Sequence, residues 1–188
     1  MSLDAVIITA DLAYRPYRSP NYEAENLALR ALMEQLASSP SGALDLLVQT
    51  ALSLCRAQSA GVSIEENQDG LSVFRWHAVA GEWTKYLGGT MPRDASPCGT
   101  VLDLNCALLM ARPHLHYPIP PDVEPRISEV LLVPFRSKDK PVGTIWIIHH
   151  DEHRKFDRED LRVMTSLSAF AGAGFTILGG KQDSYGVR

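Results

Sequence analysis

The sequence predicts an α+β domain in which helices from both ends of the chain cover one face of a mainly antiparallel sheet. Three observations support this class: two helical patterns come first, hairpin-type strand pairs follow, and a capped helix ends the series. Hairpins produce antiparallel pairing, and helices that flank them in sequence can gather on one side of the sheet. A chain of 188 residues with 45% hydrophobic content suits one domain with a core of normal size.

The first part of the chain predicts an arm and two helices. Residues 1–20 are expected to form an extended N-terminal arm, because prolines 16 and 20 disfavour helix in the residues before them. A helical pattern begins near Asn21 and is interrupted at residues 38–42. A second pattern follows, with an apolar stripe from Leu44 to Cys55. Two amphipathic helices of this kind can cover a sheet or pair with a second copy.

The strand signals come next. The Asp69-Gly70 pair separates two alternating segments and predicts a hairpin. Residues 129–135 and 142–148 are apolar on both faces, so we expect central strands that are covered on both sides. The proline-rich residues 111–127 predict a long loop, which is uncommon in a compact domain unless it has a function.

The last helix has the clearest start signal. Asp157 is a good N-cap, and Asp160 stands where it can complete a capping box. Apolar residues then recur at three- and four-residue spacing, and Gly179-Gly180 is expected to end the helix. Residues 179–188 are therefore predicted to be a flexible C-terminal tail.

The stretch from Met91 to Cys106 carries the strongest local signal for chemistry. Ser96 is an N-cap candidate, and Pro97 falls on the first helical position, where its missing N–H is harmless. Cys98 then lies in the positive end of a helix dipole, which favours a thiolate, and Arg93 lies nearby in sequence. The stretch predicts a helix mouth that could receive an anionic ligand or carry a reactive thiol.

Several segments in order resemble a GAF domain of the kind found in bacterial two-component sensor proteins. They are Ala60-Gly61-Val62-Ser63, Met91 to Asp103, Ile127 to Phe135, Pro141 to Trp146 and Phe156 to Leu161. The resemblance implies a GAF/PAS-like antiparallel sheet of 5–6 strands over residues 21–178, the sensory domain. It places the N- and C-terminal helices on one face and the short helix and long loop over the other. It also implies a small-molecule pocket beneath them and dimerisation through the terminal helices.

We expect the pocket to draw on the middle segment and its neighbours, with no metal ligand and no catalytic residue. The pocket candidates are Trp76, Arg93, Asp94, Cys98, Gly99, Asp103, His116, Tyr117 and Glu129. Arginine readily holds anionic groups, so the mouth of the short helix is the first place to look for such a ligand. The sequence leaves the identity of any cofactor open.

Other chemistries have weaker support. Free methionine sulfoxide reductases of this family contain a segment like Cys98-Gly99-Thr100, but residues 111–128 lack their attacking cysteine, which leaves Cys106 as the only nearby partner. Bilin attachment needs a Cys-His pair, which is absent. The cyclic-nucleotide signature keeps Phe156 and its acidic residues but has His149-His150 in place of Asn-Lys. The histidines of residues 114–116 and 149–153 are interpreted as surface residues rather than metal or heme ligands.

The favoured hypothesis is a non-enzymatic sensory domain that binds a small molecule and forms a homodimer. It would signal to a histidine kinase or another output module through its terminal helices. A net charge of −4 without a basic stripe gives no reason to expect nucleic acid. No apolar run suits a membrane span or a signal peptide, so a cytoplasmic location is expected. The alternatives are a thiol-redox protein using Cys98 and a ligand-free dimerisation scaffold.

Overall fold

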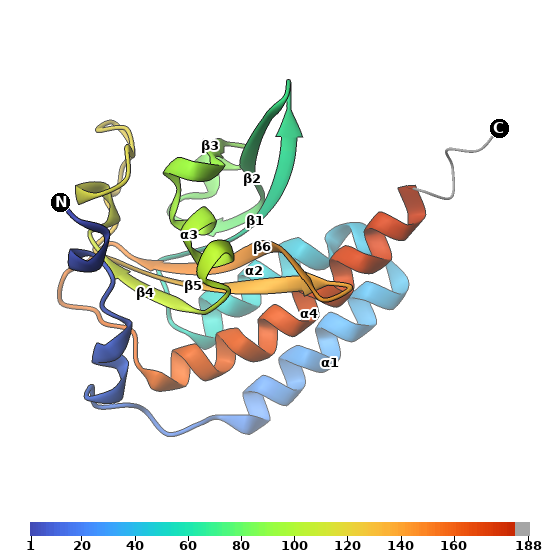
Figure 1. Ribbon diagram of the computed structural model, residues 1–188. Coiled ribbons are helices and arrows are strands. Elements are labelled where there is room, and N and C mark those ends of the chain that lie inside the picture. The colour runs from blue at the N-terminus through green and yellow to red at the C-terminus, as the bar shows by residue number, and fades with distance from the viewer. Residues whose placement is uncertain (183–188) are drawn as a thin grey trace.

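The computed structural model describes the backbone of residues 1–182 and the side chains of residues 1–177. A six-stranded antiparallel sheet has the order β3-β2-β1-β6-β5-β4 (Figure 1). The strands are β1 (Ser59–Gln68), β2 (Leu71–Gly81), β3 (Thr90–Pro92), β4 (Leu108–Ala111), β5 (Glu129–Ser137) and β6 (Lys140–His149). The helices are α1 (Tyr22–Ser38), α2 (Ala43–Leu54), α3 (Pro97–Leu104) and α4 (Arg158–Gln182). The expected fold class is confirmed.

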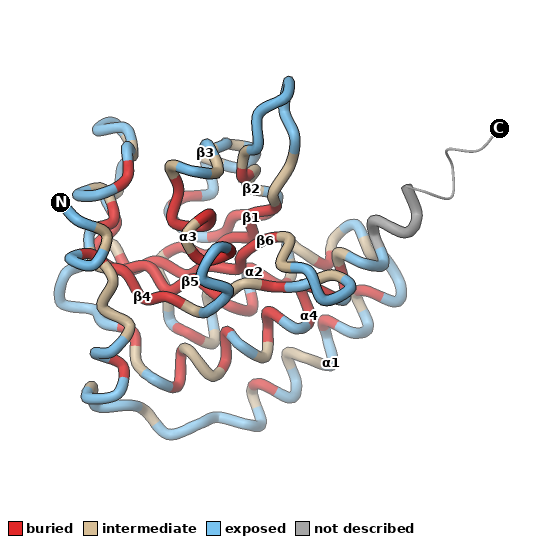
Figure 2. The backbone as a smooth tube through the Cα atoms, viewed as in Figure 1, coloured by how far each residue is buried: buried red, intermediate tan, exposed pale blue. Residues whose placement is uncertain are grey.

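Helices α1, α2 and α4 lie on one side of the sheet, and α3 lies on the other with the segment of residues 113–127 (Figure 1). Buried side chains form a core on each side of the sheet. Figure 2 shows buried residues in the central strands, in α3 on one side and in α2 and α4 on the other. Along β5, Leu131 belongs to the helix-side core and Leu132 to the opposite core. This alternation explains why the central strands are apolar at every position.

The N-terminal segment differs from the expected extended arm. It contains two short 3-10 turns, Leu3–Ala5 and Thr9–Ala13, and it lies along the outer edge of β4. The backbone N–H of Ile8 donates to the carbonyl of Leu109 at 2.8 Å, and that of Ala111 donates to Val6 at 2.9 Å. Because an uncovered edge strand leaves its backbone groups unpaired, these contacts explain why the segment packs here.

The start of α4 agrees with its sequence signal. Asp157 Oδ1 accepts hydrogen bonds from the N–H groups of Glu159 and Asp160, at 2.7 and 3.0 Å. Asp160 Oδ2 accepts from the N–H of Asp157 at 2.8 Å, which completes a reciprocal capping box.

The end of α4 differs from the expectation, since the helix passes Gly179-Gly180 and continues to Gln182. Residues 183–188 of the predicted tail lie outside the described residues. Within the described part of the chain, no helix has the length and apolarity needed to cross a membrane.

Candidate functional site

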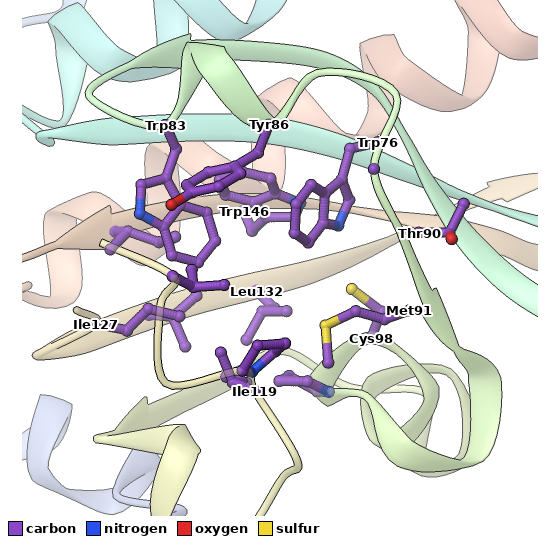
Figure 3. A pocket seen from close by; sticks show the side chains of 16 residues that line it. Trp76, Trp83, Tyr86, Thr90, Met91, Cys98, Ile119, Ile127, Leu132 and Trp146 are labelled. Carbon is purple, nitrogen blue, oxygen red and sulfur yellow. The ribbon is translucent and has the colours of Figure 1, made fainter. Parts of the chain in front are cut away.

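A cavity of about 170 Å³ lies between the sheet, α3 and the segment of residues 113–127 (Figure 3). It is on the side of the sheet opposite α1, α2 and α4. Its lining comes from Trp76, Trp83, Tyr86, Gly89, Thr90, Met91, Pro97, Cys98, Ile119, Pro120, Val123, Ile127, Val130, Leu132, Trp146 and Ile148. An apolar, concave space of this kind is a natural binding site for a small molecule.

Four aromatic rings form one wall of the cavity. Trp76 is on β2, Trp83 and Tyr86 are on the connector after it, and Trp146 is on β6. The ring centroids of Trp83 lie 5.4 Å from Tyr86 and 6.0 Å from Trp146, and Trp76 lies 5.8 Å from Trp83. The chain has three tryptophans, and all three line this cavity.

Trp146 occupies its place because β1 has a glycine beneath it. A Cβ at Gly61 would lie 2.1 Å from the Trp146 ring, so any larger residue would displace the indole. The indole N–H donates to Ser63 Oγ at 2.8 Å, on the same strand. The Gly61 and Ser63 positions of β1 therefore fix the orientation of an aromatic residue on the neighbouring strand.

The polar ends of two wall residues hold residues 119–127, which we call the roof segment. The Trp83 indole N–H donates to the carbonyl of Pro125 at 2.9 Å. The Tyr86 hydroxyl donates to the carbonyl of Glu124 and accepts from its N–H. His150 Nδ1 lies 2.9 Å from the carbonyl of Arg126. One side of the cavity is thus covered by a segment that is bonded to the aromatic wall.

Cys98 lies in the first turn of α3 and contributes its sulfur to the cavity wall (Figure 3). It is 6% exposed, and Thr144 Oγ1 donates to its Sγ at 3.2 Å. Burial raises the pKa of the Cys98 thiol, although its hydrogen bonds act in the opposite direction. The helix dipole alone would favour a thiolate, but desolvation in the apolar wall is larger and favours the thiol.

The mouth of α3 offers little to an anion. Ser96 caps the helix by accepting from the Gly99 N–H at 3.1 Å. Arg93 lies outside the cavity lining, where its Nε donates to Glu65 Oε1 at 3.0 Å and its Nη groups bind Asp103. The hydrogen bond from Arg93 lowers the pKa of Asp103. Asp94 is exposed, and its carboxylate is 3.6 Å from Arg93 Nη1. The arginine is therefore matched by carboxylates of this chain.

The remaining candidates lie outside the cavity lining as well. Gly99 allows a close approach of the chain, since a Cβ there would be 2.0 Å from the Arg93 carbonyl. The Tyr117 hydroxyl is 2.7 Å from Thr100 Oγ1, and His116 Nδ1 is 2.9 Å from the carbonyl of Met1. The buried Glu129 carboxylate is bonded to Arg15 of the N-terminal segment. Of the nine candidates, Trp76 and Cys98 line the cavity.

Trp83 and Tyr86 lie in the connector between β2 and β3 and were not among the predicted site residues. A signal was present, because two large aromatic residues in a short connector are unusual unless they are packed against something. Trp146, in a strand that was predicted to be central, is both buried and part of the cavity wall.

The GAF domain family model matches residues 39–175, and the chain belongs to this family. No sequence among curated proteins gives a significant match.

Solved structures give the same fold. The GAF domain of a phosphoenolpyruvate-protein phosphotransferase (ptsP) from Coxiella burnetii has a TM-score of 0.73 at 18% identity and covers 87% of this chain and 99% of its own. The GAF-B domain of DevS from Mycobacterium smegmatis has a TM-score of 0.60 at 17% identity and covers 78% and 99%. Free methionine-R-sulfoxide reductase from Neisseria meningitidis, in complex with its substrate, has a TM-score of 0.62 at 13% identity and covers 86% and 95%. At these identities, the likeness concerns the fold alone.

Proposed function

We propose that this chain is a non-enzymatic sensory domain that binds a small molecule in the aromatic-walled cavity. The observation that carries the proposal is the cavity itself, about 170 Å³ in volume and lined by every tryptophan of the chain. The bound molecule would alter the position of the roof segment and of α3. The terminal helices would then pass the change to an attached or associated output module.

The central strands supply a route between the two faces of the sheet. On β5, Val130 and Leu132 line the cavity, whereas Leu131 packs in the core beneath the helices. On β6, Ile148 lines the cavity and Ile147 faces the helices. A shift of either strand caused by a ligand would therefore reach the surface on which α4 packs.

The proposal extends to the partners. The solved relatives include GAF domains that belong to a phosphotransferase and to DevS, so an output module elsewhere is consistent with the domain type. We place this domain in a two-component or similar pathway in the cytoplasm, with a histidine kinase as one possible output. We propose in addition a homodimer through the terminal helices, which would cover Leu27 and Met33 on α1, both more than half exposed.

The thiol-redox alternative has less support from the geometry. Cys98 lies in the first turn of α3, and Cys106 lies two residues beyond the end of this helix. Cys98 is buried in the cavity wall whereas Cys106 is exposed, so the two thiols face different surroundings and pairing would require a rearrangement at α3. The scaffold alternative expects a pocket filled by the protein's own side chains, and the cavity volume weighs against it.

Native mass spectrometry of the protein purified from its own cells tests this function. We expect a bound small molecule in the native spectrum, and hydrogen exchange should change in α1 and α4 when the molecule is removed. A ligand-free spectrum together with unchanged exchange in those helices would favour the scaffold. Light scattering at several concentrations tests the homodimer independently.

A further inference from the structure

The chemistry of the cavity wall restricts the ligand. Among the residues that the structure describes, the lining includes no Asp, Glu, Lys, Arg or His. Opposite the aromatic wall, the lining is aliphatic and comes from the roof segment and the central strands, as Ile119, Ile127 and Leu132 show (Figure 3). A ligand with a formal charge would lose its hydration here without gaining a partner of opposite charge.

Most polar atoms of the wall are already bonded within the chain. The indole N–H groups of Trp83 and Trp146 donate to Pro125 and Ser63, and the Tyr86 hydroxyl is bonded to Glu124. The Cys98 sulfur accepts from Thr144. A ligand therefore meets mainly ring and aliphatic carbon. The groups left unbonded among the described lining residues are the Trp76 indole N–H and the Met91 sulfur, with the exposed Thr90 at the edge of the cavity (Figure 3).

The spacing of the rings distinguishes a site for an organic cation from a site for a neutral molecule. Organic cations are held between aromatic rings that lie on different sides of the charge, each within about 6 Å of it. Here five of the six ring pairs have centroid distances of 5.4 to 6.3 Å, which is the separation of rings in direct contact. The rings therefore form a packed wall with no space for a cation between them.

We propose that the cavity selects a neutral, apolar molecule of about the size of a substituted benzene ring, held between the aromatic wall and the aliphatic roof. This inference rests on the proposed function, because it names the ligand class of the same site. The size is reasonable, since an apolar cavity of roughly 150 Å³ can hold benzene. It differs from the anionic ligand that the mouth of α3 suggested, because Arg93 and the helix N-terminus are occupied by groups of the chain itself.

Three probes with the same ring test the selectivity. Propylbenzene is neutral, phenethylammonium replaces its terminal methyl group by an ammonium, and phenylacetate carries a carboxylate. Tryptophan fluorescence reports binding at this site, because Trp76, Trp83 and Trp146 all line it and the chain has no other tryptophan. We expect propylbenzene to bind the wild-type protein at least about tenfold more tightly than either charged probe.

A matched pair of variants locates the binding. Ile119 is a partly buried roof residue and Ile177 is 44% exposed on α4, outside the cavity lining. Ile119→Glu places a carboxylate at the cavity. It should therefore lower the affinity for propylbenzene about tenfold and raise the affinity for phenethylammonium. Ile177→Glu should leave the affinities for all three probes unchanged. Circular dichroism of both variants checks that they fold.

The outcomes separate the ligand class from the function. If a charged probe binds the wild-type protein as tightly as propylbenzene and responds to Ile119→Glu, the cavity is a binding site and the ligand class is wrong. If Ile119→Glu leaves the affinity for propylbenzene unchanged, propylbenzene binds elsewhere and the inference fails. If no probe binds and the native spectrum is also ligand-free, the proposed function fails together with the inference.

Discussion

The hydroxyl of Tyr86 is hydrogen-bonded to both backbone groups of Glu124: it donates to the carbonyl at 3.0 Å and accepts from the N–H at 2.9 Å. The ring of the same tyrosine belongs to the aromatic wall of the cavity. Trp83 has the same two-sided role, since its ring lines the cavity and its N–H holds Pro125. Two residues that would touch a ligand thus also hold the roof segment in place.

Removing the Tyr86 hydroxyl should weaken the attachment of the roof segment and leave the aromatic wall intact. Tyr86→Phe retains the ring but leaves the Glu124 backbone to water, so we expect a loss of about 1 kcal/mol in the free energy of unfolding. Amide hydrogen exchange should become faster within residues 119–127, and propylbenzene should dissociate faster. Tyr14→Phe is the control, because Tyr14 is 88% exposed. Unchanged exchange in the roof segment would show that the Tyr86–Glu124 hydrogen bonds do not hold this segment in place.

Adding one methyl group to β1 should disturb the cavity from below. Gly61→Ala places a Cβ against the Trp146 ring, and we expect a loss of about 2 kcal/mol with a shift in tryptophan emission. Gly174→Ala is the matched control, since its Cβ would meet nothing closer than 4.0 Å and alanine favours a helix by about 1 kcal/mol. Urea unfolding measures the free energy of unfolding of both variants. A Gly61→Ala variant as stable as the wild-type protein would mean that the indole can move freely.

Much of the fold could be predicted because its signals are local. The Asp69-Gly70 hairpin, the Ser96 cap and the Asp157–Asp160 capping box each depend on neighbours within a few residues. The packing of the N-terminal segment depends on the edge of β4, about a hundred residues away in the sequence. No periodicity within residues 1–20 reports such a partner, so the expected extended arm differs from the packed turns.

The site was harder to predict because sequence proximity to Cys98 does not determine which way a side chain points. Arg93 precedes the cysteine by five residues, yet Glu65 and Asp103 hold it outside the cavity lining. Trp83 and Tyr86 reach the cavity from a connector whose path depends on the whole sheet. The charge of Arg93 and the helix dipole predicted a ligand site at the N-terminus of α3. The cavity is instead formed by packing between segments that are distant in the sequence.

Arg15 should be important for stability although it lies in the N-terminal segment. Its guanidinium makes two hydrogen bonds to Glu129, at 2.9 and 3.0 Å, and the Glu129 side chain is 1% exposed. Arg15→Met should cost about 3 kcal/mol, because among the described residues it leaves the buried carboxylate with Lys155 as its one remaining ionic partner. Arg30→Met, at an exposed site on α1, is the control.

A second substitution separates the charge from the packing. If the cost of Arg15→Met comes from the unpaired carboxylate, adding Glu129→Leu should recover part of it in thermal unfolding. Additive losses in the double variant would show instead that each side chain stabilises the fold through separate contacts.

His149 is buried, in contrast to the surface position that the sequence predicted, and stability should fall at moderately acidic pH because of it. Burial lowers the pKa of His149 to about 4, with Arg154 acting in the same direction and Glu129 against it. Its neutral ring stacks on Phe156 at a centroid distance of 4.0 Å. The unfolded chain takes up a proton near pH 6.5 and the folded chain does so near pH 4, so this contribution is complete above pH 6.5 and declines as the pH falls.

The test compares pH slopes. Between pH 6.5 and 5, the stability of the wild-type protein should fall relative to His149→Gln by about 2 kcal/mol, measured by urea unfolding. His153→Gln, at an exposed loop position, should have the slope of the wild-type protein. Parallel curves for wild type and His149→Gln would show that the histidine is not kept neutral by the fold.

The three cysteines should react in the order of their exposure. Cys106 is exposed, whereas Cys55 and Cys98 are 2% and 6% exposed, and burial raises the pKa of both buried thiols. A thiol reagent should therefore modify Cys106 first, and Cys106→Ser should leave the native protein nearly inert until denaturant is added. Bound propylbenzene should slow the modification of Cys98 further and leave the modification rate of Cys55 unchanged, because Cys98 lines the cavity and Cys55 does not. Mass spectrometry of peptides identifies each site. Native Cys98 that reacts as fast as Cys106 would instead favour the thiol-redox alternative, since only an accessible thiolate reacts at that rate.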